Sequence, residues 1–222
     1  MEAFSAWLAA AGLSYLIGAI PFGYIVASMR GVDIRLVGSG NIGATNVLRT
    51  VGKPWGILTF CCDAMKGFTA VAVLPKLAIK LGYTGDLQIL QILCATLAIS
   101  GHNWPVYLKF KGGKGIATSA GVLLGLGWES MVVGLLVWLV VFVVSRYVSL
   151  ASIAAAVAVP AAAWLLYLSR GVLIPAALTV LGLLAVWRHR SNIRRLLNGT
   201  ENRFEFGRCR QPTADKTKGD RP

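Results

Sequence analysis

The stretch from Ser130 to Ser145, SMVVGLLVWLVVFVVS, is apolar between its two end serines and carries no charged side chain. At about 1.5 Å per residue, a helix of this length nearly crosses the hydrocarbon core of a bilayer. Comparable runs recur through the chain, which has 222 residues and is 56% hydrophobic and only 14% charged. They cover residues 5–28, 54–74, 87–108, 150–168 and 172–187. The sequence therefore predicts an all-α, polytopic membrane protein.

The distribution of basic residues predicts how these helices are oriented. A further apolar stretch, 115–127, is short and is expected to form a short or partly re-entrant helix, which brings the total to about seven membrane-crossing helices. With the N-terminus outside, four inner segments hold 18 of the 22 Lys and Arg residues, namely 30–53, 109–114, 146–149 and 188–222. Cytoplasmic loops of membrane proteins carry such an excess of positive charge. We therefore expect an outside N-terminus and a cytoplasmic C-terminus.

The domain organisation is simple, because there is no clear internal repeat. Residues 1–204 are expected to form a single integral-membrane domain. Residues 205–222 are polar and are predicted to be a disordered cytoplasmic tail. The net charge of +13 does not indicate nucleic-acid binding, because it lies in short loops between apolar runs. Anionic membrane lipids are the expected partners of that charge.

The first of two Gly-rich loops, residues 38–46, reads GSGNIGATN. Its glycines spell G-x-G-x-x-G, but no βαβ unit follows, so a dinucleotide site is not predicted. Glycines expose backbone N–H groups to an anion, short polar side chains add donors, and Arg49, placed at a helix start, would bind phosphate oxygens. The alternative is a tight turn whose polar residues cap helices. The candidate phosphate ligands are Ser39, Gly40, Asn41, Gly43, Thr45, Asn46 and Arg49.

The second Gly-rich loop, residues 109–115, reads KFKGGKG. It is not a nucleotide P-loop, because Gly115 follows the lysine where Ser or Thr is required. Lys114 is flanked by glycines that allow a ligand to approach closely, whereas the other two lysines are expected to face lipid headgroups. The candidate phosphate ligands here are Gly112, Gly113, Lys114 and Gly115. His102, upstream of the loop, is either catalytic or a helix-end histidine bonded to backbone.

Two later segments place polar residues on the same predicted inner face. Ser149 and Ser152 are three apart, and either is a site residue or only a helix N-cap. His189 and Asn192 are also three apart, on one face of a last helix that is expected to continue past the membrane surface. Such a pair suits hydrogen bonding to a hydroxyl or a phosphate, although a basic helix end at the interface is the alternative.

Other charged residues leave alternatives open. Asp63 and Lys66 lie within an apolar run, where charges are costly, and either pair with each other or contact substrate. Arg194 and Arg195 are expected to extend to lipid headgroups.

Missing motifs restrict the chemistry. The sequence contains no Ser-His-Asp or Cys-His arrangement, no paired carboxylates and no acyltransferase H-x-x-x-x-D motif. With only two histidines, far apart, no metal site is predicted and no cofactor is expected. A transfer reaction would therefore need an activated donor, and catalysis would depend on positioning and charge stabilisation. A transporter of a phosphorylated metabolite and a basic membrane scaffold are the alternatives from other functional classes.

These motifs together resemble one family, the bacterial acyl-phosphate:glycerol-3-phosphate acyltransferases, or PlsY family. The similar stretches are 38–46 with Arg49 and Gly52-Lys53, 63–67, 101–102 through 110–115, 146–152, and 188–193 to 202–204. The resemblance implies that Ser39, Arg49, Lys114, Ser152, His189 and Asn192 are the catalytic residues, and it favours Ser152 over Ser149. It also implies that the loop glycines form a phosphate pocket.

The implied reaction moves a fatty acyl group from acyl phosphate to the 1-hydroxyl of glycerol 3-phosphate, giving lysophosphatidic acid and phosphate. The implied location is the bacterial inner membrane, with the active site facing the cytoplasm. Besides the two substrates and membrane lipids, the soluble enzyme that forms the acyl phosphate is a candidate partner.

Overall fold

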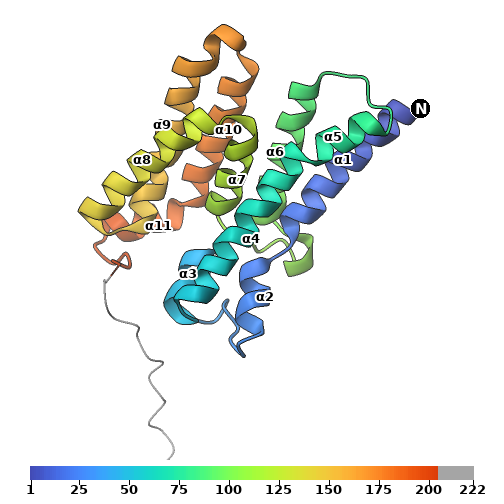
Figure 1. The fold of residues 1–222 in the computed structure, drawn as a ribbon. Helices are drawn as coiled ribbons and strands as arrows, with labels where there is room; N and C mark the ends of the chain where they lie inside the picture. The colour runs from blue at the N-terminus through green and yellow to red at the C-terminus, as the bar shows by residue number, and fades with distance from the viewer. Residues whose placement is uncertain (205–222) are drawn as a thin grey trace, which may run out of the picture.

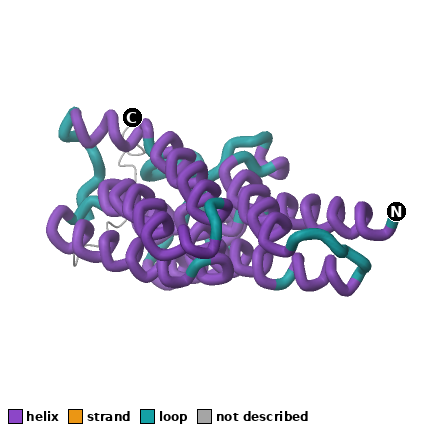
Figure 2. Tube along the Cα trace, turned by 90° about the horizontal axis from the view of Figure 1, so that it is seen from above, coloured by secondary structure: helices purple, strands orange, loops and turns teal. Residues whose placement is uncertain are grey.

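The computed structural model describes residues 1–204, and the predicted disordered tail, 205–222, lies outside the described residues. The described chain is helical and contains no strand (Figures 1 and 2). The longer helices are α1 (Glu2–Ala19), α4 (Lys53–Ala72), α6 (Leu87–Asn103), α7 (Ile116–Leu126), α8 (Trp128–Ser145), α9 (Val148–Tyr167) and α10 (Leu173–Arg188). The shorter ones are α2 (Phe22–Ser28), α3 (Ala44–Thr50), α5 (Leu74–Lys80) and α11 (Arg190–Leu197), with 3-10 turns η1 (Val106–Leu108) and η2 (Leu168–Arg170). The all-α prediction is confirmed.

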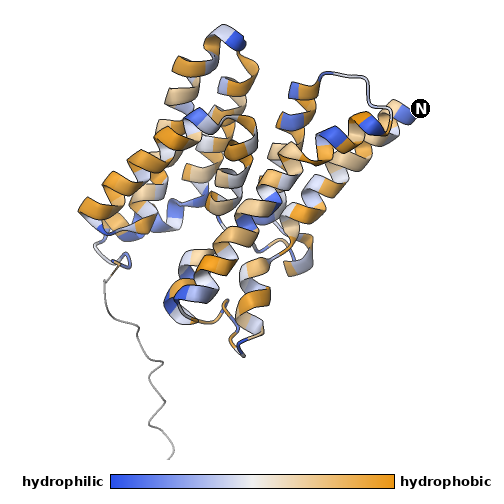
Figure 3. Ribbon diagram, in the orientation of Figure 1, coloured by the Kyte–Doolittle hydropathy of each residue, from blue (hydrophilic) through white to orange (hydrophobic). Residues whose placement is uncertain are grey.

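Several of the helices are long and apolar enough to cross a bilayer. Within the described chain these are the stretches Glu2–Ser28, Lys53–Lys80, Trp128–Ser145 and Val148–Arg170. The helices Ile116–Leu126 and Leu173–Arg188 are apolar but shorter. Many large apolar side chains are exposed, and in Figure 3 the long helices are mostly coloured as hydrophobic. Leu165 is 86% exposed and Val144 is 77% exposed, so a lipid environment is needed to cover these faces.

Prolines divide two of the apolar runs that the sequence presents as continuous. The run 5–28 ends its first helix at Ala19, before Pro21, and the run 54–74 breaks after Ala72, before Pro75. A proline ring has no N–H to donate to the carbonyl four residues earlier. At the second break that carbonyl belongs to Val71, and it accepts a hydrogen bond of 3.4 Å from Gln91 Nε2 on α6 instead.

Two helix groups flank α7 (Figure 1). On one side α1 packs against α6, and on the other α8 and α10 pack against α9. Helix α7 joins them by packing closely on α4 and also contacting α6 and α8. A Cβ atom added to Gly121 of α7 would lie 1.7 Å from the carbonyl oxygen of Ala64 on α4. Only glycine permits this approach, which sets the position of α7 and of the loop that precedes it.

Candidate active site

One cavity of about 830 Å³ collects polar residues from segments that are distant in sequence. Its walls come from α3, α4, α6, α7, α8, α9, α10 and α11, together with both Gly-rich loops and the residues Glu201, Asn202 and Phe204. The predicted site residues that line it are Ser39, Asn41, Gly43, Thr45, Asn46, Arg49, Lys114, Gly115, Ser152, His189 and Asn192. Gly40, Gly112 and Gly113 lie beside this lining and belong to the loops that support it.

The first loop is shaped by Asn46, which is almost completely buried. Its Nδ2 donates to the carbonyls of Ile34, Val37 and Asn41 at 2.9–3.2 Å, and its Oδ1 accepts from Ser39 N at 3.0 Å. These bonds fold the loop into a concave turn in which Gly40 has a φ of +67°. The Asn46 side chain therefore acts on the site mainly by holding the backbone of the first loop in place.

The sequence predicts Arg49 at the start of a helix, and this prediction is wrong. Helix α3 begins at Ala44, and Arg49 lies in its last turn. The N–H groups of the first turn, from Ala44 and Thr45, have no helical carbonyl to bond, and both residues line the cavity. The Arg49 guanidinium donates to the carbonyl oxygen of Asn202 at 3.2 Å. Burial lowers the pKa of Arg49 from its ordinary value, against the opposing effect of nearby Glu201.

The second loop is held by Arg188 at the end of α10. Its guanidinium donates to the carbonyl oxygens of Gly112 and Gly113, and lies 5.2 Å from the Trp104 ring. Lys114 is half-buried at the cavity, whereas Lys109 and Lys111 are exposed. Burial lowers the pKa of Lys114 to about 8, with nearby Arg195, Arg49 and Arg188 adding to the shift and Glu201 opposing it.

Neither Ser149 nor Ser152 caps a helix, so the N-cap alternative is wrong. The N-cap of α9 is Tyr147, which makes no side-chain cap bond. Ser149 Oγ donates to Glu201 Oε1 at 2.9 Å. Ser152 Oγ donates to the carbonyl of Val148 at 2.8 Å and accepts from Trp138 Nε1 at 3.2 Å. Both hydroxyls line the cavity, one turn apart.

The last helix does not continue past Arg188, contrary to the sequence interpretation. Helix α10 ends there, His189 forms the junction with φ −91° and ψ 5°, and α11 begins at Arg190. His189 Nδ1 lies 2.8 Å from the carbonyl of Ala185. Because a carbonyl only accepts, Nδ1 carries the hydrogen. Burial and the nearby Lys114 lower the pKa of His189 to about 4, so at neutral pH its Nε2 is an acceptor.

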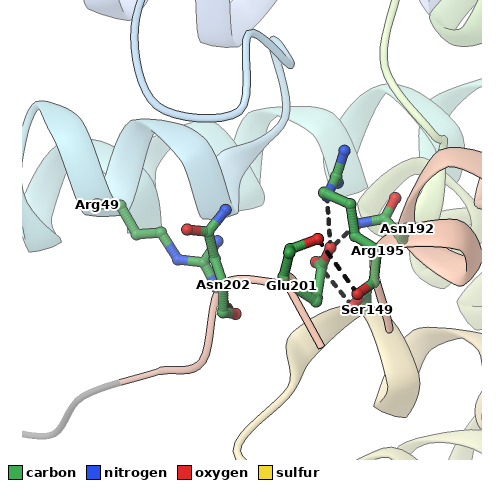
Figure 4. A network of polar contacts seen from close by, with 7 residues as sticks. Arg49, Ser149, Asn192, Arg195, Glu201 and Asn202 are labelled. Carbon is green, nitrogen blue, oxygen red and sulfur yellow. Dashed lines mark hydrogen bonds and ion pairs between the residues drawn. The ribbon is translucent and has the colours of Figure 1, made fainter. Parts of the chain in front are cut away.

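Glu201 is a cavity residue that the sequence interpretation missed. Its Oε1 accepts from Asn192 Nδ2 at 2.8 Å and from Ser149, and its Oε2 accepts from Arg195 Nε at 2.7 Å (Figure 4). Although burial opposes ionisation, these hydrogen bonds hold the pKa of Glu201 below its ordinary value. Arg195 therefore pairs inside the site and does not extend to headgroups, whereas Arg194 is exposed.

Away from this polar end, the cavity continues as an apolar limb between the helices. Beyond Lys114 and Ser152, the cavity is lined by apolar side chains from α7, α8 and α10, among them Val122, Trp138 and Leu181. The limb has an open side, because Leu135 on α8 and Ile57 on α4 line it and are 58% and 59% exposed. The arrangement suits a molecule with an anionic head and a long apolar chain.

Comparisons with known proteins agree with this geometry. The sequence profile of the family described as "Glycerol-3-phosphate acyltransferase" matches residues 8–199. Similar proteins of that name include those of Desulforamulus reducens, 47% identical over 87% of this chain and 92% of the relative, and Syntrophotalea carbinolica, 48% identical over 86% and 94%.

Crystal structures of PlsY, an integral membrane glycerol 3-phosphate acyltransferase, are also similar. The glycerol 3-phosphate form has a TM-score of 0.80 and 39% identity, and covers 90% of this chain and 96% of that one. The lysophosphatidic acid form has a TM-score of 0.78 and 38% identity, covering 90% and 95%. The chain therefore belongs to the glycerol-3-phosphate acyltransferase family of integral membrane proteins.

Proposed function

We propose that this enzyme transfers a fatty acyl group from acyl phosphate to the 1-hydroxyl of glycerol 3-phosphate, giving lysophosphatidic acid and inorganic phosphate. The observation that carries the proposal is the single cavity that joins a cationic, Gly-rich end to an apolar limb. The two ends match the two parts of an acyl phosphate. Membership of the family supports the acceptor, since related structures are described in glycerol 3-phosphate and lysophosphatidic acid forms.

The reaction needs no resident nucleophile, because acyl phosphate is an activated mixed anhydride. The acceptor hydroxyl attacks the acyl carbon, an ester C–O bond forms, the bond to phosphate breaks, and phosphate leaves. The hydroxyl proton passes to the phosphate group of the acceptor. The protein contributes positioning and charge stabilisation, which require fixed donors around the developing negative charge.

We assign the phosphate groups to the cationic end of the cavity. Arg49 and Lys114 supply positive charge from two different segments, and Ser39 with Thr45 supply hydroxyls at the first loop. Backbone N–H groups of the Gly-rich loops complete the phosphate pocket. The remaining loop residues shape this pocket, namely Gly40, Asn41, Gly43, Asn46, Gly112, Gly113 and Gly115.

Ser152, His189 and Asn192 orient the acceptor. The neutral Nε2 of His189 suits a hydroxyl donor, because Nδ1–H is already used by the Ala185 carbonyl. Asn192 is held by Glu201 through its Nδ2, so its Oδ1 is the atom that turns to the ligand. The acyl chain follows the apolar limb and reaches lipid through the open side between α4 and α8.

The membrane topology has seven spans, with the site at the cytoplasmic face of the inner membrane. Two observations support this: Met1 and the end of the described chain lie at opposite ends of the bundle in Figure 1, and most of the Lys and Arg residues fall in the segments assigned to the inner side. An active site on that face is open to glycerol 3-phosphate. It is also open to the soluble enzyme that supplies acyl phosphate.

The direct test is phosphate release by the purified protein in detergent. We expect palmitoyl phosphate to yield inorganic phosphate and lysophosphatidic acid only when glycerol 3-phosphate is present, with both products in equal amounts. Palmitoyl phosphate alone, and glycerol alone as acceptor, are the controls. Glycerol 3-phosphate binding without any product would contradict the proposal and favour a transporter.

The pH dependence of this assay should report Lys114. A lysine with a pKa of about 8 is charged below that pH and loses its charge above it, so log kcat/KM should fall as pH rises through about 8. The kcat/KM profile reports groups of the free enzyme. In Lys114→Arg the fall should disappear from this range, because a guanidinium stays charged. An unchanged alkaline limb in that variant would contradict the assignment.

A further inference from the structure

A buried charged pair lies outside the mechanism described above. Asp63 and Lys66 are one turn apart on α4, with Asp63 Oδ1 2.8 Å from Lys66 Nζ and each side chain only 2% exposed. They lie within a stretch long and apolar enough to cross a bilayer. Ionisable groups at such depth are expensive and usually serve a function. A packed apolar pair would stabilise the fold at least as well.

The pair has a third member, His102, at the end of α6. His102 Nδ1 lies 3.5 Å from the same Asp63 oxygen, and its side chain is 4% exposed. Lys66 Nζ also donates to the carbonyl of Ile20, at the break between α1 and α2, at 2.8 Å. The carboxylate therefore lies between the Lys66 ammonium, which is bonded at the break between α1 and α2, and the His102 imidazole on α6.

The other edge of the His102 ring contacts the second Gly-rich loop. A Cβ atom on Gly113 would fall 2.1 Å from His102 Nε2, and Gly113 N donates to the His102 carbonyl at 3.1 Å. Both the ring and the backbone of His102 therefore contact Gly113, the residue that precedes Lys114. A continuous series of contacts runs from Lys66 through Asp63 and His102 to this loop.

We propose that Asp63 and His102 are positioning residues that hold the second Gly-rich loop so that Lys114 faces the cavity, with Lys66 neutralising the buried carboxylate. The inference rests on the proposed role of Lys114 in binding phosphate. Asp63 orients the imidazole, the imidazole supports Gly113, and Gly113 places the neighbouring lysine. Arg188 also holds this loop, through the Gly112 and Gly113 carbonyls.

The test removes both charges together, since a single substitution would leave the other charge buried and unpaired. In the double variant Asp63→Asn with Lys66→Met, we expect a folded protein whose kcat/KM for glycerol 3-phosphate is about 10- to 100-fold lower, the range seen in metalloenzymes when a residue that orients a metal-binding histidine is removed. A matched control, Glu129→Gln with Arg170→Met, removes the ion pair at the other end of the bundle. Its kcat/KM should stay near the wild-type value.

The pH profile separates positioning from a loss of stability. If Lys114 leaves its half-buried place, its pKa rises from about 8 toward its ordinary 10.5, so the alkaline limb of the double variant should move upward. Glu201, Arg195, Arg49 and Arg188, which also act on that pKa, are unchanged in the variant. A folded double variant with an unmoved limb would overturn the inference, whether or not its activity falls.

A second cycle decides the question if the double variant does not fold. Gly113→Ala alone should lower kcat/KM, because its methyl group meets the His102 ring. In a His102→Ala background the same methyl group has room, so Gly113→Ala should cost little more. Strictly additive losses would overturn the inference. Lys114→Ala separates the two proposals. If that variant stays active, the proposed site is wrong. If it is inactive but the losses in the Gly113 and His102 variants are additive, only the positioning role of Asp63 and His102 is wrong.

Discussion

Lys114→Ala is expected to lower kcat/KM for glycerol 3-phosphate by roughly 100- to 1,000-fold, the range observed when one donor to a developing charge is removed. Lys114 is half-buried at the cavity, so in the variant water would not fully substitute for the lost ammonium group. Lys114→Arg should recover part of the loss, because it keeps the charge but changes the geometry. The measurement is steady-state phosphate release by purified, folded protein.

Two exposed lysines in the same loop provide the matched control. Lys109→Ala and Lys111→Ala remove the same charge but lie outside the cavity lining, so their kcat/KM should stay near the wild-type value. Surface substitutions of this kind usually change the free energy of unfolding by less than about 0.5 kcal/mol. His189→Ala should also be strongly impaired, since it removes an acceptor that lines the same cavity. Near-normal turnover in both Lys114→Ala and His189→Ala would refute the site.

Gly121→Leu is expected to have the largest effect on stability. A Cβ atom at this position would meet backbone atoms of α4: the Ala64 carbonyl oxygen at 1.7 Å, its carbon at 2.6 Å and Phe68 N at 2.9 Å. Backbone cannot rotate aside as a side chain can, so α7 must separate from α4. Overpacking of this kind costs about 1–3 kcal/mol or more, and small residues at such crossings drive helix association in membranes.

The loss should appear as a lower apparent Tm of the detergent-solubilised protein and a lower yield of folded enzyme. Gly121→Ala should lie between wild type and Gly121→Leu. The control is Gly12→Ala on α1, where an added Cβ has no neighbour within 4 Å. That change should be neutral or raise stability by up to about 1 kcal/mol through helix propensity. An unchanged Tm in Gly121→Leu would show that α7 does not need this close approach.

The helices were predictable from sequence because a bilayer requires long apolar segments with internally bonded backbone. The run 130–145 corresponds closely to α8 at Trp128–Ser145. The breaks were not predicted, since Pro21 and Pro75 lie inside runs that stay apolar, and hydropathy does not register a missing N–H. The end of α10 at Arg188 was also missed, because nothing in the local sequence forbids helix at His189.

The site was predictable where its residues are unusual for their surroundings. Gly-rich polar loops between apolar runs stand out, and Lys114 is distinguished from its neighbours by its flanking glycines. Glu201 was not predictable, because it follows the last helix in a short polar stretch. Its partners Ser149 and Asn192 belong to other segments, and only tertiary packing brings them to one carboxylate.

The position of Glu201 and Asn202 has a consequence for biosynthesis. Both residues line the cavity, yet they come after every helix of the described chain. Domains of a growing polypeptide fold from the N-terminus as they leave the ribosome. A nascent chain whose described helices have already been inserted therefore still lacks these two lining residues, and its pocket is incomplete until translation has passed them.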